Sequence, residues 1–159
     1  MDLLRSMNHA QDHVIQARHN EEFLAEIDHA KFPDWAITAC FYSAVHWVEA
    51  AIRVAEHLKI KRRDGMIVRI KQPISTDDLK SEIGETSPHR VRKHLLLSNP
   101  AYFKCSRPYN SLMEDSHTSR YTCYRRIPSE RVALCLGYLA AVKVGLDDCL
   151  TGAPSEKKA

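Results

Sequence analysis

The sequence predicts an all-α protein, built as an antiparallel bundle of four main helices with one or two short helices added. Apolar residues recur at three- and four-residue steps through four long segments, which is the spacing of one helix face. Glycine is scarce, at five of 159 residues, and these segments lack the alternation typical of strands. The length suits one domain, expected over residues 1–150, followed by a disordered tail at 151–159.

The first two helices are predicted at about residues 2–30 and 32–58. Asp2 can cap the first helix. In the second, Pro33 fits the first turn, where its missing N–H costs nothing, and Asp34 places a carboxylate at the positive end of the helix. Apolar residues occur almost all round this second helix, which predicts a central position with several helices packed against it.

The helical pattern stops in the basic segment 59–71, which holds six Lys or Arg residues against one acid, Asp64. Gly65 and Pro73 are helix breakers. One interpretation is a solvated, mobile connector, and the alternative is a loop that contacts phosphate groups. Residues 66–70 have the composition of a short strand, but a single strand needs a partner.

Several short segments then precede the last helix. A short helix is predicted at 75–83, and Ser87-Pro88 is a typical helix start. Asn99 is the expected cap of the following helix, which Pro108 either kinks or divides.

The last helix is predicted at about 129–150. Gly137 and Gly145 each weaken it by about 1 kcal/mol relative to Ala, so we expect them to allow close contact with a neighbouring helix.

The amino-acid composition indicates in which cellular compartment the protein is expected. No apolar run approaches the roughly 20 residues needed to cross a bilayer, and the N-terminus becomes polar within a few residues, unlike a signal peptide. The five cysteines are an odd number without a CxxC pair, which favours a reducing compartment. We therefore expect a cytoplasmic protein without membrane contact. No Gly-rich phosphate loop occurs, and neither a metal site nor a cofactor is expected.

A polar line crosses the otherwise apolar second helix. Tyr42, His46 and Glu49 follow each other at steps of four and three, so they share one face. One interpretation is a set of buried polar groups that hydrogen-bond to other helices. The alternative is a polar face against which a cleft or a partner chain closes.

The segment SPHRVRKH carries the densest group of possible ligand-binding residues. His89 and Arg92 are three residues apart, while Arg90, Lys93 and His94 flank them near a helix start. Cations at the positive end of a helix make an anion site chemically reasonable, and a histidine can exchange protons while an arginine holds a phosphate. The alternative is an exposed basic helix face.

A third group lies in residues 115–126. Arg120 and Tyr121 are followed by further arginines, and a tyrosine beside arginines can stack on a nucleic-acid base. The alternative is that these side chains only hydrogen-bond the last carbonyls of a helix.

Taken together and in this order, these motifs resemble bacterial proteins of the HEPN superfamily over about residues 1–150. The pattern consists of proline, Asp-Trp, Phe-Tyr, Ala and His, then His-x-x-Arg, then Tyr-x-x-Leu, Ser and Arg-Tyr. In this chain the matching positions are Pro33, Asp34, Trp35, Phe41, Tyr42, Ala44, His46, His89, Arg92, Tyr109, Leu112, Ser116 or Ser119, Arg120 and Tyr121.

The resemblance implies a helical bundle that pairs as a homodimer. Many members of the superfamily are metal-independent ribonucleases of toxin–antitoxin or anti-phage defence systems, and others bind RNA or nucleotides without catalysis. The implied partners are RNA or a nucleotide, together with a cognate antitoxin or nucleotidyltransferase. The nucleases carry an arginine followed by a histidine after four to six residues, and no such spacing occurs here.

Three functional hypotheses follow: a HEPN-like RNA- or nucleotide-binding protein, a metal-independent endoribonuclease that uses 2′-hydroxyl attack on phosphate, and a non-catalytic dimerisation or adaptor module. The candidate catalytic residues are His89, Arg92 and His94. The candidate binding residues are Tyr42, His46, Glu49, Arg90, Lys93, Tyr109, Arg120 and Tyr121. We expect at least three of His46, His89, Arg92 and Arg120 to line one cleft.

Overall fold

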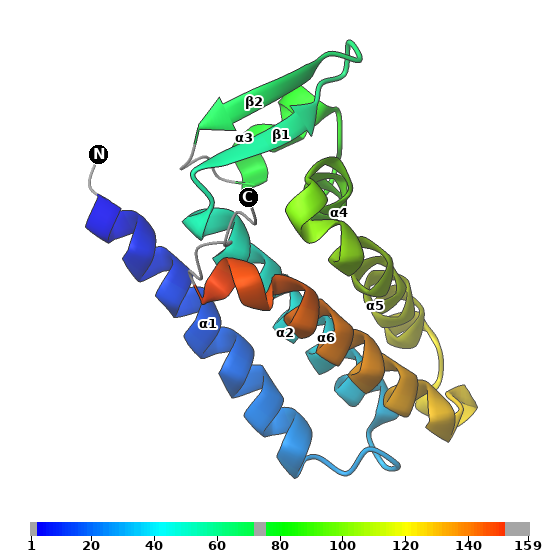
Figure 1. The fold of residues 1–159 in the computed structure, drawn as a ribbon. Helices are drawn as coiled ribbons and strands as arrows, with labels where there is room; N and C mark the ends of the chain where they lie inside the picture. Colours follow the sequence, from blue (N-terminus) through cyan, green and yellow to red (C-terminus); the bar gives the residue numbers. More distant parts are fainter. Residues whose placement is uncertain (1–2, 72–75, 152–159) are drawn as a thin grey trace, which may run out of the picture.

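The computed structural model describes residues 3–71 and 76–151 (Figure 1). This part of the chain is mostly helical, with six α-helices, two short 3-10 turns and one two-stranded hairpin. The predicted cap Asp2 and the tail 152–159 lie outside the described residues. No helix in the described ranges combines the length and the apolar character needed to span a bilayer.

Four long helices form the body of the molecule: α1 (Leu3–Glu26), α2 (Pro33–Val54), α5 (Phe103–Tyr121) and α6 (Ser129–Leu150). As predicted, α2 is central, because α1, α5 and α6 all pack against it (Figure 1). Its Ile37, Phe41 and Val48 are almost fully buried. Pro33 occupies the first turn of α2 and Asp34 follows it, as expected. The predicted bounds of α6 match the observed ones.

The segment predicted as a mobile connector is an ordered antiparallel hairpin, so that interpretation is wrong. Strand β1 (His57–Lys61) pairs with β2 (Ile67–Lys71), with Leu58 opposite Ile70. Helix α2 therefore ends at Val54 rather than near residue 58. The missed signal was the alternation of His57–Lys61, whose apolar side chains point inward, followed by a turn in which Gly65 adopts a φ of +88°.

Helix α4 (Pro88–Ser98) and the residue after it hold the outer edge of β1. The Asn99 side chain accepts from Lys59 N–H at 2.8 Å and donates to Lys59 O at 3.0 Å and to Leu95 O at 2.8 Å. His94 Nε2 accepts from Lys61 N–H at 3.1 Å. Asn99 was expected to cap the next helix, but its side chain acts as a partner for the strand.

Replacing Asn99 by Ala is expected to lower the free energy of unfolding by about 1–3 kcal/mol, because the Lys59 and Leu95 groups lose their partner in a buried place. Urea unfolding followed by circular dichroism measures this change. The matched control is Asn20→Ala, since Asn20 accepts only one exposed hydrogen bond, from Gln16. Equal losses in the two variants would contradict the anchoring role.

The remaining helices position the candidate site. Helix α3 (Thr76–Ile83) lies with the hairpin at one end of the bundle (Figure 1). Ser87 caps α4 as predicted, with its hydroxyl oxygen accepting from His89 N–H at 3.2 Å. Helix α5 starts at Phe103, after a 3-10 turn, and continues through Pro108 without dividing.

Candidate functional site

A buried carboxylate lies at the centre of the polar residues. Glu49 of α2 is 3% exposed, and its Oε1 accepts from Arg92 Nε and from Thr76 Oγ1, both at 2.6 Å. Arg53 Nε lies 3.5 Å from Oε2. Burial by itself raises the pKa of Glu49, but the Arg92 guanidinium, the hydrogen bonds from Thr76 and Arg92, and the charge of Arg53 outweigh it and lower that pKa. Glu49 is therefore ionised and held by α3, α4 and its own helix.

Arg92 connects this carboxylate to His89. Its second donor, Nη1, lies 3.0 Å from His89 Nδ1. Because a guanidinium only donates, Nδ1 must accept, and the proton of the neutral ring is on Nε2. Burial first, and then the charges of Arg92 and Arg120, lower the pKa of His89. His89 is thus a neutral ring that offers one N–H donor.

The rings beside His89 fix its orientation. Phe41 meets it edge-on with centroids 5.0 Å apart, and Tyr42 lies 6.1 Å away in a similar arrangement. Tyr109, fully buried, donates its hydroxyl to His89 O at 3.4 Å. His89 is therefore held by packing as well as by Arg92, as a rigid binding group requires.

His46 has a separate partner. Its Nδ1 lies 2.8 Å from Nδ1 of His13 in α1, so one ring donates and the other accepts. Burial is the main cause that lowers the pKa of both rings, that of His13 to about 4. Sequence reasoning missed this pair, because 33 residues separate its members and no local pattern links them.

A cavity of about 420 Å³ opens between α2, α4 and α5, a volume typical of small-molecule sites. Three cationic side chains line it, Arg90, Lys93 and Arg120, against one carboxylate, Glu114. A second acid, Glu85, lies 3.9 Å from Arg90. The full lining is Phe41, Ser87, His89, Arg90, Lys93, Asn110, Met113, Glu114, His117, Thr118 and Arg120.

The four residues expected to share one cleft form two groups. His89 and Arg120 line the cavity. Arg92 contacts His89, but its Nε donates a hydrogen bond to Glu49. His46 is hydrogen-bonded to His13. Two of the four therefore line this cavity, and a third touches one of those two. Arg120 also donates from Nε to Ser116 O at 3.2 Å, a carbonyl inside α5.

Other candidate residues have structural contacts. Glu49 and Tyr109 are buried, so they support the site from the core and present no surface to a ligand. His94 uses Nε2 to hold β1. Tyr121 is 79% exposed and lies 5.1 Å from His117, a cavity residue, measured between ring centroids.

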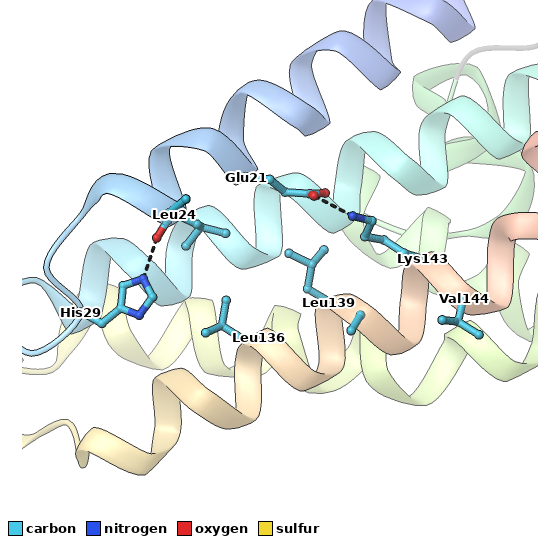
Figure 2. Close-up of a pocket in the computed structure, with 9 residues that line it drawn as sticks. Glu21, Leu24, His29, Leu136, Leu139, Lys143 and Val144 are labelled. Carbon is cyan, nitrogen blue, oxygen red and sulfur yellow. Dashed lines mark hydrogen bonds and ion pairs between the residues drawn. The ribbon is translucent and has the colours of Figure 1, made fainter.

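A second cavity, of about 490 Å³, lies between α1 and α6 (Figure 2). Its walls are mostly apolar, and its polar groups bind one another. Lys143 Nζ lies 2.6 Å from Glu21 Oε2, and His29 Nε2 lies 2.7 Å from Leu24 O. It therefore offers a ligand fewer free polar groups than the first cavity does.

Comparisons with protein-family models, with curated proteins and with solved structures found no match to this chain.

Proposed function

We propose that this chain is a HEPN-like protein that binds RNA or a nucleotide, with a phosphate group held in the cavity between α2, α4 and α5. The observation that carries the proposal is the charge of this cavity, where Arg90, Lys93 and Arg120 face a single lining carboxylate. The same cavity is lined by His89 and Arg120, which are two positions of the residue pattern by which this chain resembles the superfamily.

The donors suit a phosphate. An arginine can present two parallel N–H groups to phosphate oxygens, and a lysine adds a compact charge. His89 contributes an Nε2–H donor that stays neutral. Helix α4 begins at this cavity, with Ser87 in its lining, so the positive end of the helix adds to the attraction.

The geometry favours binding over cleavage. A general base needs a free lone pair within reach of the proton that it removes. The His89 Nδ1 lone pair accepts from Arg92, and the His94 Nε2 lone pair accepts from Lys61. Neither of these lone pairs is available to take a proton from a 2′-hydroxyl group, which supports a binding protein rather than a ribonuclease.

Replacing Arg90 and Arg120 together by Ala is expected to weaken the binding of a fluorescent single-stranded RNA and of a mononucleotide at least tenfold, about 1.4 kcal/mol. Fluorescence anisotropy at about 50 mM salt measures the affinities, because low salt strengthens phosphate contacts. The control is the double variant Arg18→Ala/Arg107→Ala, which removes the same charge at exposed positions outside the cavity lining.

Two outcomes would contradict the proposal. One is an absence of RNA and nucleotide binding at low salt, and the other is an equal loss in the control variant. In the same experiment RNA incubated with the protein in EDTA is expected to stay intact. Cleavage that disappears in His89→Ala would instead select the ribonuclease.

A further inference from the structure

The outward face of the β-hairpin is cationic. Side chains alternate along each strand, so Leu58 and Ile60 point into the core while the residues between them point outward. The outward cations are all exposed. We refer to four of them as the cationic face: Lys59, Lys61, Arg69 and Lys71.

This face places two like charges opposite each other, because Lys59 pairs in register with Arg69. Like charges at directly opposed positions destabilise an antiparallel pair. Within the described ranges no carboxylate forms an ion pair with the four cations, whereas Arg62 beside them lies 3.7 Å from Glu82. The repulsion between the opposed cations is therefore not compensated in the hairpin, although one acidic residue at either position would relieve it.

Protection of a strand edge does not account for Lys59 and Lys61. Lysines often protect exposed edges against pairing with other chains. The outer edge of β1, however, already bonds to Asn99 and His94, yet this strand carries Lys59 and Lys61. A polyanion on the outward face explains both cations.

Helix α4 connects the hairpin with the cavity of the proposed function. Lys61 is attached through its backbone N–H to His94 of α4, and the preceding residue of α4, Lys93, lines the cavity. Helix α4 therefore joins the lining of the cavity to the edge of the hairpin through two successive residues, Lys93 and His94.

We propose that the cationic face binds successive phosphates of a single-stranded RNA, one nucleotide of which occupies the cavity. This inference rests on the proposed function of that cavity. Cations two residues apart on one strand are separated by about 6.6 Å, which gives a regular row of contacts. The outward positions include no Phe, Tyr or Trp to stack on bases, so the contacts go to the backbone and are independent of RNA sequence.

The test replaces all four residues of the cationic face by Gln and measures the affinity for a single-stranded RNA of about 20 nucleotides at several salt concentrations. Each phosphate contact to a single strand contributes about 0.7 to the slope of log K against log salt, so the slope is expected to fall by about 2–3. The affinity for a mononucleotide is expected to stay unchanged. The matched control replaces Arg18, Lys31, Lys104 and Arg107, four exposed cations elsewhere.

The outcomes separate the two proposals. Suppose that the mononucleotide binds, but the slope of log K against log salt for RNA is the same in the four-residue Gln variant as in the unmodified protein. The role of the cationic face is then refuted, and the proposal for the cavity is retained. If the RNA slope falls but no mononucleotide binds, the cavity assignment fails and the cationic face stands. Absence of both kinds of binding overturns both.

A lipid surface is the alternative polyanion, because Met66 and Ile67 near the hairpin turn are 59% and 71% exposed. Vesicles containing phosphatidylserine provide that comparison. If the four-residue Gln variant loses vesicle binding while its RNA binding is unaffected, the ligand of the cationic face is a membrane and not RNA. That result would overturn the inference.

Discussion

Glu49→Ala is expected to lower the free energy of unfolding by about 3–5 kcal/mol, the usual effect of breaking a buried ion pair by removing one partner. The variant leaves Arg92, whose side chain is 11% exposed, without its carboxylate. It also leaves the Thr76 hydroxyl without its acceptor. Urea unfolding measures the loss, and Glu22→Ala is the control. Glu22 is exposed and pairs weakly with His19 at 3.9 Å, so its loss is expected to stay within about 0.5 kcal/mol.

A double-mutant cycle tests whether the loss comes from the Glu49–Arg92 pair. With both side chains replaced by Ala, the total loss is expected to fall short of the sum of the single losses, because neither Glu49 nor Arg92 is then left without the other. Additive losses would show that the two residues act independently.

The same pair sets the response to acid. The pKa of Glu49 in the folded protein is below its ordinary value of 4.5. The stabilisation is therefore fully present above pH 4.5 and is lost as the pH falls below that value, through the pKa of the folded state. In Glu49→Gln this contribution to the pH dependence of unfolding is expected to disappear. An unchanged acid limb of the stability profile would contradict the assignment.

The two glycines of α6 are expected to respond to Ala with opposite signs. A Cβ on Gly145 would collide with Cys105 Sγ, whereas a Cβ on Gly137 would meet no atom within 4 Å. Cys105 is fully buried, and its thiol is directed to Val142 O at 3.5 Å, so it has little room to move. Overpacking of this kind costs about 1–3 kcal/mol, while Gly137→Ala is expected to stabilise the helix by about 1 kcal/mol.

Thermal and urea unfolding of the two variants measure these changes. A second comparison isolates the cause, since Cys105→Ala removes the sulfur atom. In that background Gly145→Ala is expected to lose its destabilising effect. If it destabilises both backgrounds equally, the close approach of α5 and α6 at this point is not the reason for the glycine.

Local signals were sufficient to locate the starts of three helices. Pro33, Ser87 with Pro88, and the periodicity of residues 129–150 identified where α2, α4 and α6 begin. These signals act within one turn, through missing N–H groups, capping oxygens and three- or four-residue spacing, so they can be read without a partner. The hairpin was missed because two five-residue strands become stable only when they pair and pack.

For the candidate site, too, one part could be predicted from local sequence signals and another part could not. The sequence by itself determined that His89, Arg90, Arg92 and Lys93 would be gathered at the start of one helix, because neighbours on a helix stay neighbours. Only the tertiary structure decided their roles. Arg92 turns inward to Glu49, 43 residues away, and its Nη1 group determines which nitrogen of His89 carries the proton. Such pairings depend on how separate helices pack, and no local spacing encodes that packing.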